Sequence, residues 1–114
     1  MISTKGSTLI SEVTLSELAA VHAEGALVVD VREPEEYRAG HVPGAVSLPL
    51  GVVPVRAHEL PKDQPVFVVC QSGGRSYQAA EGLHQAGYDA RSVAGGTGGW
   101  VQAGRPVVRG TEPR

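Results

Sequence analysis

The chain has 114 residues, which is the length of a single domain with its own core. Its formal net charge of -2 is too small to indicate a nucleic acid or an anionic membrane as partner, and its single cysteine excludes an intrachain disulfide. No cysteine pair has zinc-ligand spacing, and the sequence contains neither a signal-peptide h-region nor an apolar run of membrane length. We therefore expect a cytoplasmic protein that needs no metal and no other cofactor.

The first third of the chain predicts a short strand, a helix and a buried strand, in that order. Residues 8–11 are apolar at their centre and predict an edge strand. Thr14 and Glu17 have the spacing of a capping box, so we expect a helix to begin there and to end at Gly25. Residues 26–31 form an apolar run without alternation, which is typical of a strand in a parallel sheet that is covered on both faces.

The middle of the chain predicts a second helix, a third strand and a crossover. Pro34 suits the first turn of a helix, and the acidic residues beside it favour a helix N-terminus. A turn with glycine and proline at 40–45 leads to a strand at 46–48. Residues 49–60 predict a short helix or an irregular crossover, which Pro54 limits.

The second half of the chain continues the alternation and indicates the fold class. Residues 66–69 predict a buried strand, a helix follows from Arg75 to about Gly87, and residues 88–94 predict a last strand. Strands and helices alternate about five times, which predicts an α/β domain with a central five-stranded parallel sheet and helices on both faces. The boundaries that we expect are a domain at 8–108 and flexible tails at 1–7 and 109–114.

The candidate site lies where the strand at 66–69 meets the following helix. The only cysteine, Cys70, stands there and is followed by Gly73, Gly74 and Arg75. A strand, a short loop and a helix N-terminus direct several backbone N–H groups toward one point, with the positive end of the helix dipole behind them. Helix N-termini and nearby arginines favour the thiolate, the nucleophilic form of cysteine. A lone cysteine is often only a small buried hydrophobic residue, but the Gly-Gly-Arg sequence in this context favours an activated nucleophile.

The spacing between Cys70 and Arg75 indicates which group the loop can hold. Cysteine phosphatases commonly place the arginine after five intervening residues, whereas here four lie between Cys70 and Arg75. The smaller loop suits a single sulfur atom, carried on the cysteine as a persulfide. Together with Asp30-Val31-Arg32-Glu33 and the stretch from Gly40 to Ala45, this loop resembles the signature stretches of single-domain rhodaneses, which are thiosulfate sulfurtransferases. The resemblance extends from about Leu9 to Val108.

The resemblance to rhodaneses implies a rhodanese-like fold and a two-step reaction. Cys70 would take the outer sulfur of thiosulfate or a related donor and pass it from a persulfide to a thiol or cyanide, with a sulfur-relay protein as a further partner. Arg75 would hold the anionic oxygens of the donor. Many family members carry a basic residue directly after the cysteine, whereas Gln71 is neutral and leaves less positive charge there. The implied substrate-binding residues are Gln71, Ser72, Gly73, Gly74, Arg75 and Ser76.

Three polar residues upstream of the cysteine each have two interpretations. Asp30 and Arg32 follow a predicted strand at the edge where α/β sheets bind ligands, which leaves a catalytic acid–base role open. We favour a structural ion-paired network, because sulfur transfer to a thiolate requires no proton relay and buried charges are usually paired. His41 suggests a Cys–His dyad, but its turn matches the structural signature of the family, which favours a structural role.

Two other functions remain open. A cysteine phosphatase or an arsenate reductase-like enzyme would use the same class of loop, although the short spacing between Cys70 and Arg75 argues against both. A non-catalytic interaction module is also known for the rhodanese-like fold, but such a module is expected to lack the cysteine, and Cys70 is present. An assay with several sulfur donors would separate these functions.

Overall fold

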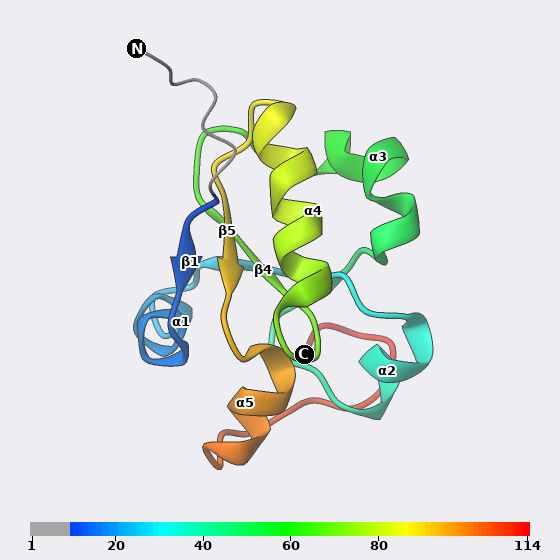
Figure 1. Cartoon of the computed structure of the whole chain (residues 1–114). Helices are drawn as coiled ribbons and strands as arrows, with labels where there is room; N and C mark the ends of the chain where they lie inside the picture. The colour runs from blue at the N-terminus through cyan, green and yellow to red at the C-terminus, as the bar shows by residue number, and fades with distance from the viewer. Residues whose placement is uncertain (1–9) are drawn as a thin grey trace.

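The structure, a computed structural model, describes residues 10–114, in which short strands alternate with helices along the chain (Figure 1). The strands are β1 (Glu12–Val13), β2 (Leu27–Asp30), β3 (Val46–Ser47), β4 (Val66–Val69) and β5 (Ala90–Val93). The helices are α1 (Leu15–His22), α2 (Pro34–Ala39), α3 (Val53–Arg56), α4 (Gly74–Gln85) and α5 (Gly96–Gln102). Two 3₁₀ turns, η1 (Leu50–Val52) and η2 (Ala57–Glu59), flank α3.

The five strands form one parallel sheet in the order β1-β5-β4-β2-β3. The predicted fold class is therefore confirmed. Parallel strands end at a common edge, and the register places Asp30 of β2 opposite Val69 of β4. Cys70, the next residue after Val69, consequently lies at the carboxyl edge of the sheet, close to the residues that follow Asp30.

Helices cover both faces of the sheet and produce two cores (Figure 1). Helices α3 and α4 pack on one face, and α1, α2 and α5 pack on the other. Strand β4 serves both cores, because Val66 and Val68 point to the α4 side whereas Phe67 and Val69 point to the α1 side. A strand that is buried on both faces needs apolar residues at every position, which is why this part of the sequence shows no alternation.

Local sequence signals begin two of the helices as expected. The Thr14 hydroxyl accepts the Glu17 N–H at 3.1 Å and the Glu17 carboxylate accepts the Thr14 N–H at 2.7 Å, so the capping box begins α1. Pro34 is in the first turn of α2. Pro54 does not limit the crossover at 49–60, since it lies in the first turn of α3, where its missing N–H has no helical partner to lose.

The edge strand lies further along the chain than the sequence indicated. Strand β1 contains Glu12 and Val13, which pair with Ser92 and Val93 of β5. Of the predicted strand at 8–11, residues 8 and 9 lie outside the described residues. Ile10, the apolar centre of that stretch, belongs to the core on the α4 side rather than to the sheet. Pairing with β5 determines which residues form the edge strand, and the apolar stretch around Ile10 lies just before them in the chain.

The C-terminal segment runs from α5 back to the region around α2 (Figure 1). His41 and Val108 form an isolated antiparallel bridge. Beyond it, the Gly110 N–H donates to the Arg38 carbonyl at 2.9 Å, and the Gly44 N–H donates to the Pro113 carbonyl at 2.8 Å. Residues 109–114, which the sequence suggested as a flexible tail, therefore have backbone partners in the structure. The domain boundary at 108 stays a prediction.

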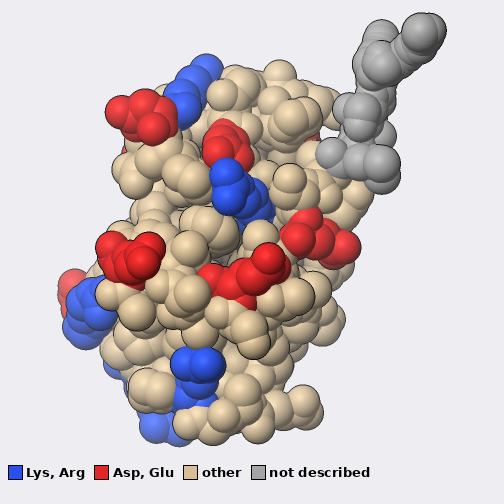
Figure 2. Space-filling model, turned by 90° about the vertical axis from the view of Figure 1, so that its left-hand side faces the viewer, with Lys and Arg blue, Asp and Glu red and all other residues tan. Residues whose placement is uncertain are grey.

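The surface shows charges of both signs. On the face of the described chain seen in Figure 2, acidic and basic side chains are dispersed and do not gather into a patch of one sign. Two of the surface ion pairs are local, Arg56 with Glu59 at 2.9 Å and Arg91 with Asp89 at 3.0 Å. Among residues 10–114, no helix has both the length and the apolar character needed to cross a membrane.

Candidate active site

Cys70 lies directly after β4, and its side chain is buried, with a residue exposure of 1%. The Gly73 N–H donates to the Cys70 Sγ at 3.0 Å, and the Ser76 Oγ lies 3.5 Å from the same sulfur. Ser76 is in the first turn of α4 and is itself fully buried. The loop and the start of the helix thus surround the sulfur with donors, as the strand–loop–helix sequence predicted.

These contacts change the acidity of the thiol. Burial raises the pKa of Cys70, since an apolar surrounding disfavours the charged form. Hydrogen bonds from the Ser76 hydroxyl and from the backbone N–H groups of Ser72, Gly73 and Ser76 lower it by more, so the pKa of Cys70 lies below its ordinary value. A larger fraction of Cys70 is therefore thiolate near neutral pH than for an unperturbed cysteine.

A second hydroxyl lies behind Ser76. Ser92 of β5 is fully buried, and its Oγ is 2.9 Å from the Ser76 Oγ. The Ser76 hydroxyl also lies 3.1 Å from the Gly73 carbonyl, so its single proton has two acceptors, that carbonyl and the sulfur of Cys70. When Ser92 donates to Ser76, the Ser76 proton remains available for the sulfur. The sequence analysis did not include Ser92, because the sequence alone does not show which residue of β5 faces α4.

Two glycines permit the backbone geometry around the sulfur. Gly73 has φ +124°, a region that residues with a Cβ atom rarely adopt, and it directly precedes α4. Gly96 approaches the loop so closely that a Cβ atom would lie 2.4 Å from the Cys70 carbonyl oxygen. The Thr97 N–H donates to that carbonyl at 2.8 Å, and the Gly98 N–H donates to the Gln71 carbonyl at 2.9 Å. The first turn of α5 therefore fixes the position of the loop by binding two of its backbone carbonyls.

Asp30 and Arg32 form a buried ion pair beside the loop. The Arg32 Nη2 donates to the Asp30 carboxylate at 2.8 Å, and the two residues are 4% and 0% exposed. The same guanidinium donates to the Gly40 carbonyl at 2.8 Å and to the Gln71 Oε1 at 3.2 Å. This arrangement connects the end of β2 to the turn after α2 and to the residue next to Cys70, in the manner of a structural network.

Arg75 is bound to a carboxylate that the sequence analysis did not assign to the site. Its guanidinium donates to both oxygens of Glu36 in α2, at 2.7 Å and 3.0 Å. Hydrogen bonds from Arg75 lower the pKa of Glu36 to about 2, against a smaller opposing effect of burial. The sequence analysis expected the Arg75 guanidinium to bind the anionic oxygens of the donor. In the structure, the Glu36 carboxylate compensates this positive charge. Glu36 carried no signal beyond an acidic residue at a helix N-terminus.

His41 lies away from the sulfur and contacts backbone groups. Its ring stacks on Tyr37, with centroids 3.7 Å apart, and its Nδ1 is 2.8 Å from the Tyr37 carbonyl. The Nε2 atom is 2.8 Å from the Glu112 carbonyl in the C-terminal segment. The side chain is fully buried, and within residues 10–114 its polar partners are all backbone carbonyls. This geometry favours the structural interpretation over a Cys–His dyad.

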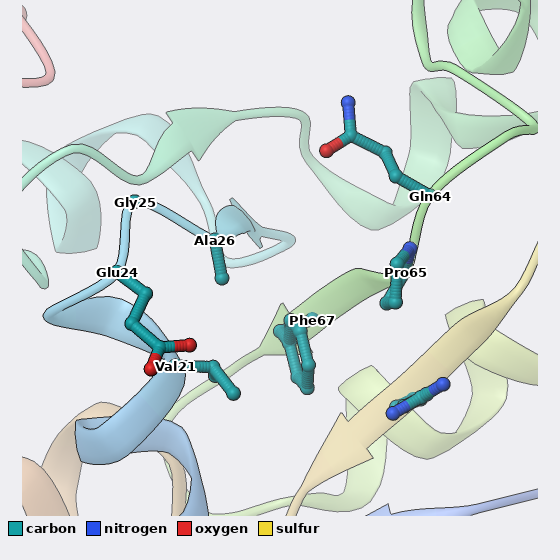
Figure 3. A pocket seen from close by; sticks show the side chains of 8 residues that line it. Val21, Glu24, Gly25, Ala26, Gln64, Pro65 and Phe67 are labelled. Carbon is teal, nitrogen blue, oxygen red and sulfur yellow. The ribbon is translucent and has the colours of Figure 1, made fainter.

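Two hollows of the described chain lie at opposite edges of the sheet. One opens at the amino edge of the sheet, where Val21, Phe67 and Glu24 line it, and it contains no nucleophilic side chain (Figure 3). The other, of ≈ 390 Å³, lies beside the Cys70 loop and is lined by Gln71 and Glu36 among others. Within the described residues, no three His, Cys, Asp or Glu side chains are grouped closely enough to hold a metal ion. The second hollow is therefore the one that borders the loop after Cys70, through Gln71.

The geometry agrees with comparisons to known proteins. A family model described as "Rhodanese-like domain" matches residues 14–103. The chain belongs to this family. Among the relatives of this rhodanese-like domain, a protein named "Sulfurtransferase" from Allochromatium vinosum is 43% identical over 86 residues, which cover 75% of this chain and 80% of the relative. A "Putative sulfur carrier protein" from Bacillus subtilis is 44% identical over 61 residues, which cover 54% of this chain but only 33% of that protein.

Solved structures support the same family. A rhodanese-related protein from Thermoplasma volcanium superposes with a TM-score of 0.81 at 30% identity, covering 90% of this chain and 99% of that one. In the present rhodanese-like domain, Gly73 and Ser76 of the loop contact the Cys70 sulfur, and the role of the loop in holding a transferred sulfur stays a prediction. Sequence reasoning missed Glu36, Ser92 and the first turn of α5, whose contacts all join segments that are far apart in the chain.

Proposed function

We propose that this rhodanese-like domain is a sulfurtransferase that carries a sulfane sulfur on Cys70 as a persulfide. The main support is the environment of the Cys70 Sγ, which is buried at 3.0 Å from the Gly73 N–H and has a lowered pKa. Donors around a buried sulfur stabilise a negative charge there, which a persulfide anion also carries. The family match and the relative named a sulfurtransferase support the same class of reaction.

The reaction has two steps, and thiosulfate serves as the first donor to test. The Cys70 thiolate attacks the outer sulfur of thiosulfate, the S–S bond of the donor breaks, and sulfite leaves with the bonding electron pair. A cysteine persulfide anion remains, with its outer sulfur directed at the N–H groups of residues 71–76. In the second step an acceptor thiolate or cyanide attacks that outer sulfur, and Cys70 leaves as the thiolate. Neither step requires a proton from Asp30 or Arg32.

The acceptor in the cell remains a separate part of the proposal. We expect either a small thiol or the reactive cysteine of a sulfur-relay protein to remove the sulfur from Cys70. The similarity to a putative sulfur carrier protein supports the second class of acceptor, although it covers only 33% of that relative.

The proposal is tested by intact mass spectrometry. After incubation with thiosulfate, the protein should gain the mass of one sulfur atom, and a reducing thiol should remove it. Cys70→Ser should show neither the added mass nor thiocyanate formation in the presence of cyanide. Thiocyanate formation by the Cys70→Ser protein would contradict a persulfide on this residue.

The same preparations test the phosphatase alternative. With four residues between Cys70 and Arg75, the loop should be too small for a phosphoryl group, so hydrolysis of aryl phosphates should stay at background. Phosphate release that depends on Cys70, without sulfur transfer from any donor, would replace the sulfurtransferase proposal with a cysteine phosphatase.

A further inference from the structure

A buried serine lies in β5, the neighbour of the strand that leads to Cys70. Ser92 pairs in register with Val68 of β4, and its side chain is 0% exposed. Successive side chains of a strand point to opposite faces, so Ser92 faces α4, as does Ala90 of the core on that side. A hydroxyl buried there is unfavourable unless it has a hydrogen-bond partner, and alanine would occupy the position without that cost. Packing alone therefore does not explain Ser92.

Among residues 10–114, the hydroxyl of Ser92 has one hydrogen-bond partner, the hydroxyl of Ser76. The two Oγ atoms are 2.9 Å apart, and both side chains are fully buried, so bulk solvent offers neither hydroxyl an alternative partner. The Ser76 Oγ also lies 3.1 Å from the Gly73 carbonyl oxygen and 3.5 Å from the Cys70 sulfur. Ser76 thus connects Ser92 to the sulfur.

The number of protons indicates the direction of the hydrogen bond between the two serines. Each hydroxyl has one proton to donate. If Ser76 donated to Ser92, the proton of Ser92 would have no acceptor within the described residues, and the sulfur would lose Ser76 as a donor. If Ser92 donates to Ser76, both protons have acceptors, because the Ser76 proton can bind the Gly73 carbonyl or the sulfur. Buried polar groups rarely lack partners, which favours donation from Ser92 to Ser76.

The charge on the sulfur then determines where the Ser76 proton points. While Cys70 is a thiol, the Gly73 carbonyl is the better acceptor, because a thiol sulfur accepts hydrogen bonds weakly. A thiolate is negatively charged, and hydrogen bonds to ionised acceptors are about twice as strong as neutral ones. A hydroxyl that itself accepts a hydrogen bond is a better donor, by about 10–30% per bond. Donation from Ser92 therefore strengthens the hydrogen bond from Ser76 to the thiolate.

We propose that Ser92 is a positioning residue for sulfur transfer, whose hydroxyl donates to Ser76 and directs the Ser76 proton to the ionised sulfur of Cys70. Within the described residues Ser92 makes no hydrogen bond to the sulfur, so it acts through Ser76. The inference rests on the proposed sulfurtransferase function and adds a residue to it. The Cys70 thiolate is the attacking group in the first step and the leaving group in the second, so its stabilisation affects both steps.

A double-mutant cycle on the pKa of Cys70 tests this proposal without requiring turnover. The ultraviolet absorbance of the thiolate is titrated in the unmodified protein, in Ser76→Ala, in Ser92→Ala and in the double variant. Ser92→Ala should raise the pKa by about 0.3–0.5 unit, because it removes the cooperative part of the hydrogen bond from Ser76. In the Ser76→Ala background, the same substitution should add less than about 0.1 unit, because Ser92 then has no hydroxyl through which to act.

Ser47→Ala is the matched control for the titration. Ser47 lies in β3 of the same sheet, is half-buried, and has no side-chain hydrogen bond among the described residues. Its replacement should leave the pKa of Cys70 within about 0.1 unit of the unmodified value. Equal increments from Ser92→Ala in both backgrounds would show that β5 acts on the loop by packing. No increment at all would show that the Ser76 proton stays on the Gly73 carbonyl, and either result would overturn the proposal.

The pH profile of persulfide formation from thiosulfate, measured in single turnovers, gives a second test. In Ser92→Ala the acid limb of the profile should move to higher pH by the same amount as the thiol pKa. The rate on the alkaline plateau should stay within about twofold, because the sulfur is then fully ionised in both proteins. A lowered plateau with an unmoved acid limb would identify Ser92 as a packing residue and overturn the proposal. If the unmodified protein forms no persulfide from any donor, the proposed function fails, whereas the double-mutant cycle still decides whether Ser92 acts on the sulfur through Ser76.

Discussion

The acidity of Cys70 depends on one buried hydroxyl and on the backbone around it. The Ser76 Oγ is 3.5 Å from the sulfur and 2.9 Å from the Ser92 Oγ, so a chain of two hydroxyls leads from β5 to the Cys70 sulfur. Burial by itself would hold the thiol protonated, and these donors more than offset it. The protein thus places the Cys70 thiol in a dry environment and still keeps it ionisable, which the proposed attack on a sulfane sulfur requires.

The contribution of Ser76 can be measured directly. Ser76→Ala removes one donor to the thiolate, so the pKa of Cys70 should rise by about one unit, and the acid limb of the pH profile of kcat/KM should shift to higher pH by the same amount. The pKa is read from the ultraviolet absorbance of the thiolate during a pH titration. Ser72→Ala is the matched control for this titration: Ser72 is exposed and acts on the sulfur through its backbone N–H, which alanine retains. Equal pKa shifts in both variants would contradict the role of the Ser76 hydroxyl.

At the scale of elements, one ion pair joins α2 to α4 above the cysteine loop. The Glu36 carboxylate accepts hydrogen bonds from two nitrogens of the Arg75 guanidinium. It also accepts one from the N–H of Glu33, the N-cap residue of α2, at 3.0 Å. Its side chain is 34% exposed, so solvent weakens the interaction well below what the lowered pKa alone would suggest. The pair therefore makes a modest contribution to stability.

The stability effect has a defined pH dependence. The pKa of Glu36 falls from 4.5 in an unperturbed carboxyl to about 2, so its contribution is present above pH 4.5 and is lost as the pH falls toward 2. Glu36→Gln should lower the free energy of unfolding by about 1 kcal/mol at pH 7 and by less at pH 3. Urea denaturation at both pH values measures the difference. Glu35→Gln should show almost none, and a Glu36→Gln deficit that is as large at pH 3 as at pH 7 would exclude an ionic origin.

The elements that could be predicted from the sequence are those with local signals. The capping box at Thr14 and the apolar run of β4 depend on neighbours a few residues apart, and both were found where expected. Strand β1 has two residues and no apolar run, so only its pairing with β5 defines it. The partner of Arg75 is 39 residues away in the chain, and an ion pair of this kind leaves no periodic pattern. The position of Cys70 between β4 and α4 was therefore predictable, whereas the ion pair beside it was not.

At the scale of the whole molecule, the C-terminal segment closes the fold over α2. The His41–Val108 bridge is made by two backbone hydrogen bonds of 2.9 Å, and the following residues continue along the turn that precedes β3. The Nε2 atom of the buried His41 faces the carbonyls of Glu112 and Pro113. The same segment places Arg109 at the edge of the hollow beside the Cys70 loop.

Removal of this segment tests whether residues 109–114 are a flexible tail. Truncation after Val108 deprives His41 Nε2 and the Gly44 N–H of their carbonyl partners. Loss of partners by buried polar groups costs about 1–3 kcal/mol, so the urea midpoint should fall by an amount that corresponds to this range. Removal of Arg114 alone is the control, because the Pro113 carbonyl group remains as part of the new C-terminal carboxylate. An unchanged midpoint after truncation at Val108 would show that the segment is a flexible tail, and that its contacts contribute nothing to the fold.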